Sequence, residues 1–376
     1  MGGPDDTVVR SADLRLAGRS LPLVGTARLY VCGITPYDVT HLGHAATFVW
    51  ADALASVIRT IGVESEVCRN VTDVDDVLTR AAETRGRHYD EFALGQEYLF
   101  TQHMSQLGVR RPDHEPRARH HVGHVLQLGA ALLASGHAYV RDGYVWFRGA
   151  DTVAASGLDR EQALVLSRAY GDDPDDDAKD DPFDVPVWRP SGETDPAWPS
   201  PWGWGRPGWH AECAAMGLAV LGARIDVLAG GDDLTFPHHT YQSAMVAAAT
   251  ASEPFARRML HVGAVHQDGA KMAKSTGNLT LVSDLLTDLP PAAVRLLLLD
   301  RPWAQPWEYH PAAVTAATAR LERLYTAAGR LPSSTGATDA AGQRLLDDLD
   351  VPGALDIAED EGGDAARLVM RTLALV

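Results

Sequence analysis

The chain has 376 residues, of which 45% are hydrophobic and 22% charged, and its 50 acidic against 33 basic residues give a formal net charge of −17. This composition is typical of a globular protein, and it argues against a large nucleic-acid interface because binding phosphates requires clustered cations. No apolar run reaches membrane-spanning length, no signal peptide is recognisable, and three scattered cysteines exclude a disulfide framework, so we expect a cytoplasmic protein without membrane contact.

The first predicted elements are a strand, a helix and a second strand. Residues 27–34 are rich in β-forming residues and predict a buried strand. From residue 44 to 61 the apolar residues have helical spacing, and Gly62 ends the run. A second strand is expected over 64–69. Strand, helix and strand within about 40 residues form a βαβ unit, which predicts an α/β fold with a parallel, doubly wound sheet.

After this βαβ unit, the sequence pattern is less regular. Helices are expected between about 78 and 140, one of them over 122–134. The stretch 141–202 is rich in Asp, Pro and Trp, and we interpret it as an insertion with long loops. The α/β pattern resumes afterwards, and the remaining expected elements are a helix over 212–221, a strand over 223–229, helices near 291–299 and 311–330, a flexible link over 332–336 and a small helical C-terminal region.

The tetrapeptide His41-Leu42-Gly43-His44 follows the first strand and opens the first helix. A helix N-terminus presents free N–H groups and the positive end of the helix dipole, which suits a phosphate. Two imidazoles three residues apart can donate to phosphate oxygens as charge develops there. The alternatives are a helix-capping histidine or a metal-binding pair.

Lysine is scarce, because only three of the 33 basic residues are lysines, namely Lys179, Lys271 and Lys274. Two of them stand three positions apart in a loop bounded by Gly269 and Gly277. Mobile ammonium groups there can reach the phosphates of ATP, so the pattern indicates a nucleotide site assembled from both halves of the chain. The alternative is chance placement on a solvated loop.

A third set of residues suits a metal ion. Cys32, Cys213 and His238, the last followed by His239, are each expected at a strand end or at the start of the helix that follows. Two sulfur ligands and one nitrogen ligand leave an open position on a tetrahedral zinc ion, which can select a thiol over a hydroxyl. The alternative is that these residues are core residues, as we expect for Cys68.

Together these segments resemble a known family. HLGH and KMAKS resemble the HIGH and KMSKS signatures of class I aminoacyl-tRNA synthetases. The segments YVCGITPYDVTHLGHA, NVTDVDD, SPWGWGRPGWHAECAAM and GGDDLTFPHH are similar to the cysteinyl-tRNA synthetase branch, and most of all to the cysteine ligases of mycothiol biosynthesis. The resemblance implies a Rossmann (HUP-type) catalytic domain over 27–265 with an insertion at about 86–202. It also implies an N-terminal extension (1–26), a KMSKS-type loop and stem-contact-like region (266–300) and a helical C-terminal region (301–376).

The resemblance also implies roles for individual residues. One zinc ion would be held by Cys32, Cys213 and His238, with the substrate thiolate in the fourth place. ATP, with Mg²⁺, would be bound through the catalytic residues His41, His44, Lys271 and Lys274. The residues that would bind cysteine and the adenylate are Cys32, Gly33, Ile34, Thr35, Thr47, Asn70, Val71, Thr72, Trp209, Gly231, Asp232, Asp233 and Val265.

The acceptor is the least determined part of this hypothesis. The resemblance implies a monomeric, ATP-dependent enzyme that joins L-cysteine to the amine of glucosaminyl-inositol, a small molecule, and tRNA is not expected as a partner. Three alternatives remain, namely a ligase acting on another amine, a cysteinyl-tRNA synthetase with a reduced C-terminus, and a non-catalytic relative that binds cysteine or nucleotide as a sensor. The departures that bear on this choice are Ala273 in the KMAKS loop, Ala169-Tyr170 before GDDP, Thr240 after the two histidines, and the segment 110–121, which is more similar to the synthetases. Gln242, at the position where the synthetases have a metal-binding glutamate, favours the ligase and a three-ligand site.

Overall fold

The computed structural model describes residues 13–37, 39–74, 76–193, 195–273 and 276–376. Its centre is a four-stranded parallel sheet with the strand order β10-β9-β3-β4. These strands are β3 (Ala27–Ile34), β4 (Ser65–Val71), β9 (Ile225–Gly231) and β10 (Ala256–Val262). The predicted βαβ unit is confirmed as β3, α1 (Leu42–Thr60) and β4, with the helix beginning two residues earlier than expected.

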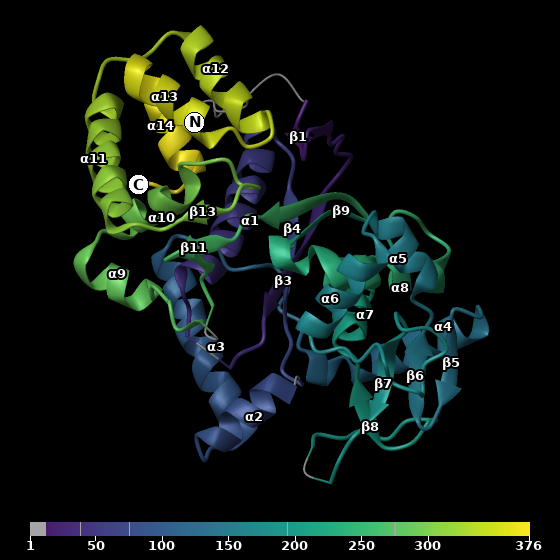
Figure 1. Cartoon of the computed structure of the whole chain (residues 1–376). Coiled ribbons are helices and arrows are strands. Elements are labelled where there is room, and N and C mark those ends of the chain that lie inside the picture. Colours follow the sequence, from purple (N-terminus) through teal and green to yellow (C-terminus); the bar gives the residue numbers. More distant parts are fainter. Residues whose placement is uncertain (1–12, 38, 75, 194, 274–275) are drawn as a thin grey trace.

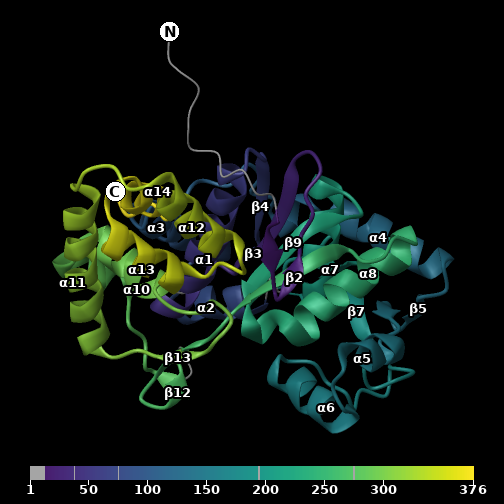
Figure 2. The same cartoon turned by 90° about the horizontal axis from the view of Figure 1, so that it is seen from above.

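Both faces of the sheet are covered by helices. Side chains alternate along a strand, so Leu29 and Val31 of β3 pack into one core, while Tyr30 and Cys32 pack into another. The first core joins α1 to α10 (Pro291–Leu299) and the C-terminal helices, and the second joins the sheet to α7 (Trp209–Leu221), α8 (Thr240–Thr250) and the insertion. Figures 1 and 2 show the sheet between these two groups of helices.

The chain between β4 and β9 is more ordered than expected. It begins with α2 (Asp76–Thr84), α3 (Tyr89–Gln106), η1 (Ala118–His120) and α4 (Val122–Ala134), the last as predicted. An antiparallel sheet follows, made of β5 (Ala138–Arg141), β6 (Tyr144–Phe147), β7 (Val185–Pro190) and β8 (Gly205–Pro207), together with α5 (Ala150–Ser156) and α6 (Arg160–Ala169). The interpretation of 141–202 as an insertion with long loops is therefore only partly right, because residues 170–184, 191–193 and 195–204 form loops while β6, α5, α6 and β7 were not expected. The strands are short and β7 contains two prolines, which hides the strand pattern although Trp188 is fully buried.

The C-terminal part is helical, as predicted. It contains α9 (Val282–Asp288), α10, α11 (Pro311–Ala328), α12 (Thr335–Leu346), α13 (Val351–Glu361) and α14 (Gly363–Thr372). The expected link over 332–336 is shorter, because the Ser334 side chain caps α12 by accepting from the amide of Ala337 at 3.1 Å.

Short elements complete the fold. They are the hairpin β1 (Arg15–Leu16) and β2 (Arg19–Ser20), the helical turns η2 (Asp232–Leu234) and η3 (Thr235–His239), and a small sheet of β11 (Val265–Gln267), β12 (Ala270–Lys271) and β13 (Trp307–Glu308). Among the described residues, no helix combines the length and apolar character needed to span a bilayer.

Candidate functional site

A cavity of about 350 Å³ opens at the carboxyl ends of the parallel strands, where α/β folds hold their ligands. Most of the residues singled out in the sequence line it, although they come from distant parts of the chain. They are Cys32, Gly33, Ile34, Thr35, His41, His44, Thr47, Asn70, Thr72, Trp209, Cys213, Gly231, Asp232, Asp233, His238, Val265 and Lys271. Val71 is not among the lining residues, and Lys274 lies outside the described residues.

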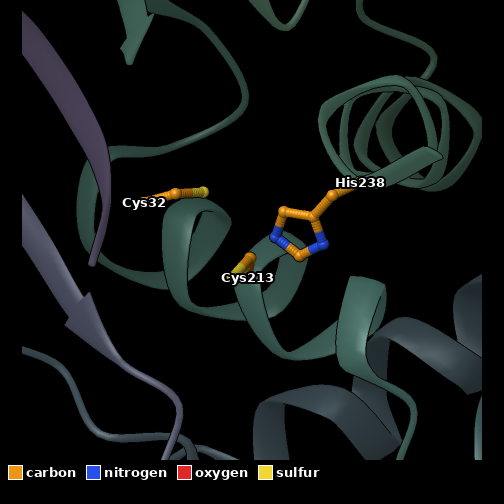
Figure 3. Close-up of side chains that lie close together, drawn as sticks. All are labelled: Cys32, Cys213 and His238. Carbon is orange, nitrogen blue, oxygen red and sulfur yellow. The ribbon is translucent and has the colours of Figure 1, made fainter. Parts of the chain in front are cut away.

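The two thiols and one imidazole predicted to bind metal lie together at this cavity. One ligand atom from each of Cys32, Cys213 and His238 lies within 4.8 Å of the other two, and all three residues are buried (Figure 3). Burial raises the pKa of the Cys32 thiol, and so does the nearby Cys213. The donor set of two sulfurs and one nitrogen fits a zinc ion, whose charge would offset the cost of keeping buried thiolates.

Neighbouring polar groups hold these ligands in place. The Cys213 sulfur accepts from the Asn70 amide at 3.3 Å, and the Cys32 sulfur lies 3.6 Å from Gln242 Oε1. Nδ1 of His238 is 2.9 Å from Nδ1 of the buried His210. Because that contact occupies Nδ1, Nε2 is the nitrogen of His238 left for a metal ion. Gln242 thus lies beside the cluster as a neutral hydrogen-bonding group.

The end of β3 and the residue that follows it approach β4 closely. Gly33 donates its amide to Asn70 Oδ1 at 2.8 Å, and a Cβ at this position would lie 1.7 Å from the Asn70 carbonyl oxygen, so only glycine fits. Next to it, the hydroxyl oxygens of Thr35 and Thr72 are 2.7 Å apart. These contacts fix the polar rim of the cavity between the two strands.

The two histidines of HLGH form one stacked pair at the start of α1. His41 is the N-cap residue, and its Nδ1 accepts from the Gly43 amide at 3.2 Å. The His41 and His44 ring centroids are 3.9 Å apart. Burial lowers the pKa of His41 to about 3, with smaller contributions from His44 and Lys271. His41 is therefore neutral at physiological pH, with its remaining proton on Nε2, which makes that nitrogen a hydrogen-bond donor.

The lowered pKa of His41 predicts a pH-dependent stability. The unfolded chain takes up a proton near pH 6.5 and the folded chain only near 3, so stability is complete above about pH 6.5 and declines as the pH falls below it. Between pH 7.5 and 5.5 this one group lowers the free energy of unfolding by about 1 kcal/mol. We expect the free energy of unfolding of His41→Asn, measured with urea, to fall by correspondingly less over this pH interval. An equal loss in both proteins would contradict this prediction.

Lys271 reaches across the cavity to the β9 side. Its Nζ lies 2.6 Å from Asp233 Oδ2, and both side chains are partly exposed. Asp232, the preceding residue, accepts from the Ala264 amide at 3.1 Å. The ion pair therefore connects β12 to η2, and a phosphate entering the cavity would compete with Asp233 for the lysine.

Several lining residues were not predicted from the sequence, among them Tyr37, Phe48, Tyr170 and Met272. Tyr170 is the clearest case. It follows α6 in the insertion, and its ring centroid lies 6.4 Å from that of Trp209 in a stacked arrangement. In the sequence, Tyr170 was noticed only because Ala169-Tyr170 departs from the pattern of the related ligases. The periodicity of the apolar residues could not place it in the cavity.

Comparison with known proteins gives consistent results. The family model for class I (C) tRNA synthetase catalytic domains matches residues 23–319. A protein of Parafrankia sp. (strain EAN1pec) named L-cysteine:1D-myo-inositol 2-amino-2-deoxy-alpha-D-glucopyranoside ligase is 43% identical over 90% of this chain and 77% of its own. The protein of the same name from Mycolicibacterium vanbaalenii is 40% identical over 96% and 86%.

Solved structures share the fold at low sequence identity. Methionyl-tRNA synthetase of Mycobacterium tuberculosis, in complex with methionyl-adenylate, matches with a TM-score of 0.62 and 17% identity, covering 94% of this chain and 82% of its own. The agnB2 LeuRS of Agrobacterium radiobacter K84, in a ternary complex with tRNA and LeuAMS, matches with a TM-score of 0.64 and 12% identity, covering 96% and 84%. These similarities confirm the class I synthetase-like fold.

Proposed function

We propose that this chain, which belongs to the class I (C) tRNA synthetase catalytic-domain family, activates L-cysteine with ATP and joins it to the amine of glucosaminyl-inositol. Within that family it belongs to the L-cysteine:1D-myo-inositol 2-amino-2-deoxy-alpha-D-glucopyranoside ligases. The observation that carries the proposal is the position of Cys32, Cys213 and His238 in the same cavity as the HLGH histidines and Lys271. The cavity thus combines a means of selecting a thiol with groups suited to phosphate.

The first function of the cavity is to bind cysteine selectively. Cys32, Cys213 and His238 would hold a zinc ion, which when bound favours a thiolate strongly over a hydroxyl. Trp209 stacks on His238 with ring centroids 4.1 Å apart, which supports a role as one wall of the amino-acid pocket. Thr35 and Asn70 supply polar atoms beside it. Serine, which has almost the same size, would then be rejected by chemistry rather than by shape.

The second task is adenylyl transfer. A carboxylate oxygen of cysteine attacks the α-phosphorus of ATP, and the bond to the pyrophosphate oxygen breaks. The neutral His41 offers its Nε2 proton to a phosphate oxygen, and Lys271 exchanges Asp233 for the phosphates as their charge shifts. Mg²⁺ bound to ATP would neutralise part of that charge. Positioning and charge stabilisation are sufficient for this step, and no covalent bond to the protein is needed.

The third task is transfer to the acceptor. The amine nitrogen attacks the carbonyl carbon of the adenylate, the bond to the AMP oxygen breaks, and the nitrogen gives up a proton as the amide forms. The acceptor must approach from the open part of the cavity. Tyr170, half-buried beside Trp209, lines this cavity from the insertion and presents an aromatic face suited to a sugar ring.

This placement predicts a selective effect at Tyr170. We expect Tyr170→Ala to raise the KM for glucosaminyl-inositol about tenfold, because a stacking surface worth about 1 kcal/mol or more is removed. Cysteine-dependent ATP–pyrophosphate exchange should change less than about twofold, because it does not use the acceptor. Steady-state AMP release and exchange, measured on the same preparation, separate the two effects. An equal loss in both reactions would contradict the assignment.

The proposal as a whole is tested by product analysis. The protein is incubated with ATP, Mg²⁺ and cysteine, with and without glucosaminyl-inositol, and AMP and the amide are quantified by mass spectrometry. We expect AMP release that depends on cysteine and is stimulated by the acceptor, with one amide formed per AMP. Cysteinyl-AMP that forms but is not consumed by this acceptor would overturn the assignment of the amine.

A further inference from the structure

A second cavity, of about 190 Å³, lies between α1, strands β3 and β4, and the loop before η1. Its walls are largely apolar and include Val31, Phe48, Ala51, Ala55, Val67 and Val109. Phe48 also lines the first cavity, so the two cavities are neighbours that share this ring. The assigned chemistry of the first cavity makes no use of the second.

The rim of the second cavity is unusually basic for a chain with a net charge of −17. Four arginines line it, against two aspartates: Arg59, Arg69, Arg110 and Arg111 against Asp52 and Asp113. Among the described residues, two further charged residues form ion pairs with this set, namely Arg295 with Asp52 and Glu115 with Arg69 and Arg111, and their charges cancel. The cavity therefore keeps a formal excess of two positive charges.

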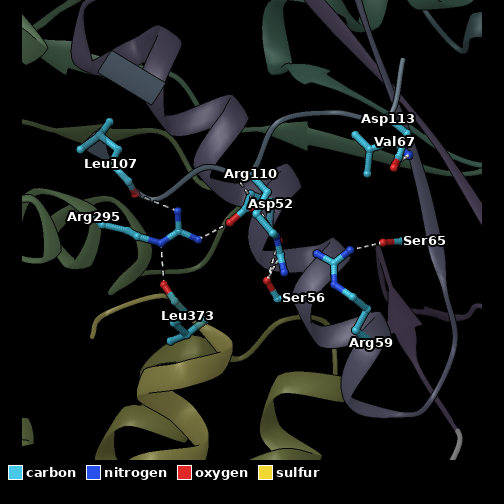
Figure 4. Close-up of polar contacts among 10 residues, drawn as sticks. All are labelled: Asp52, Ser56, Arg59, Ser65, Val67, Leu107, Arg110, Asp113, Arg295 and Leu373. Carbon is cyan, nitrogen blue, oxygen red and sulfur yellow. Dashed lines mark hydrogen bonds and ion pairs between the residues drawn. The ribbon is translucent and has the colours of Figure 1, made fainter. Parts of the chain in front are cut away.

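Most of these guanidinium groups are held by protein partners. Arg110 Nε lies 3.0 Å from Asp52 Oδ1, and Arg110 also donates to Ser56 (Figure 4). The other oxygen of Asp52 accepts from the buried Arg295 at 2.5 Å, and Arg295 also donates to the carbonyl oxygens of Leu107 and Leu373. The one carboxylate of Asp52 is thus shared by two arginines, and these contacts fix the shape of this side of the cavity.

Arg59 differs from its neighbours. It stands in the last turn of α1, and its Nη1 donates to the Ser65 hydroxyl at 2.5 Å (Figure 4). Within the described part of the chain, no carboxylate oxygen lies within 4.0 Å of its guanidinium. A guanidinium carries five N–H donors, so Arg59 has capacity for a planar anion.

The electrostatic environment of Arg59 supports the same conclusion. Burial lowers the pKa of Arg59, and the positive charge of Arg110 lowers it further, against weaker attraction from Asp52, Asp113 and the exposed Glu64. A partly desolvated cation next to another cation is a place where an added negative charge is stabilised. A fully hydrated inorganic ion would leave the apolar walls beside Arg59 in contact with water. An anion that carries an apolar body therefore fits this cavity better.

We propose that this second cavity binds a small organic anion, a carboxylate or phosphate monoester on an apolar body, with the anionic group on Arg59 and the body against Phe48, Ala51 and Ala55. The site is separate from the proposed cysteine and ATP sites and does not depend on them. An anion there neutralises one of the two excess charges, while its apolar body fills the cavity.

Binding of simple probes tests the proposal. Benzoate and phenyl phosphate carry the two anionic groups on the same ring, and benzyl alcohol and benzylamine are the neutral and cationic controls. We expect calorimetry on the full chain, with saturating ATP to keep the probes out of the first cavity, to detect benzoate or phenyl phosphate binding at least about tenfold tighter than either control.

Variants locate the site. Arg59→Gln should weaken binding of the anion at least about tenfold, Arg59→Lys less, and Ala55→Leu should abolish it by filling the cavity. Arg371→Gln, which changes an arginine in the last turn of α14, is the matched control and should bind like the unchanged protein. Thermal unfolding without probes checks that each variant is folded. If no anion binds, or if folded Arg59→Gln binds as tightly as the unchanged protein, the proposal is wrong.

Discussion

Cys213→Ser is expected to have the largest effect on activity. The change removes one of three buried ligand atoms and leaves a hydroxyl, which binds zinc poorly. We expect bound zinc, measured by elemental analysis, to fall from about one ion per chain to well below half. Cysteine-dependent ATP–pyrophosphate exchange should fall about a thousandfold, which corresponds to about 4 kcal/mol.

The chain contains a matched control for this experiment. Cys68 in β4 is equally buried, packs in the same core as Cys32 and Cys213, and is not part of the ligand group. Cys68→Ser makes the same chemical change nearby, and it should retain both the metal and the discrimination against serine. If Cys213→Ser kept its zinc and its activity, or if both variants lost them equally, the three-ligand site would be contradicted.

Lys271→Ala is expected to have the second-largest effect. Removing one positioned cation from the transferring phosphates typically slows a reaction a hundredfold to a thousandfold, so we expect the exchange rate to fall by about that amount. The loss should appear in kcat rather than in the KM for cysteine, because Lys271 contacts Asp233 and not the thiol-binding residues. Pre-steady-state formation of cysteinyl-AMP measures this directly.

A companion variant separates the two roles of this lysine. Lys271→Arg keeps the charge and should recover part of the rate, although its planar group is less suited to a mobile contact. Asp233→Asn removes the competing partner without removing the lysine. An unchanged rate of adenylate formation in Lys271→Ala would show that Lys271 takes no part in the transfer.

The sequence was sufficient to predict the central βαβ unit and most of the cavity. The apolar spacing of α1 and the β-forming residues of β3 are local signals, and they determine those elements directly. The carboxyl ends of parallel strands meet at one edge of a sheet, so Cys32, Cys213 and His238 could be expected near one another although they are distant in sequence. The parallel topology therefore allowed separate weak patterns in the sequence to be combined into one predicted site.

Other features depend on tertiary packing and left no readable pattern. The strands of the insertion are short and β7 contains proline, so β7 resembled a loop in the sequence. Tyr170 enters the cavity only because α6 ends beside α7. The contact of Asp52 with Arg295 joins residues 243 positions apart, and a pairing of this kind depends on how α1 and α10 meet in the folded chain.

We propose that this cavity activates cysteine with ATP. This proposal is tested most directly by ATP–pyrophosphate exchange, measured with cysteine and with serine, on zinc-loaded protein and without any acceptor. We expect exchange that depends on cysteine and is at least about a thousandfold less efficient with serine, because a bound zinc ion would distinguish thiolate from hydroxyl. No exchange with cysteine, or equal exchange with both amino acids, would contradict it.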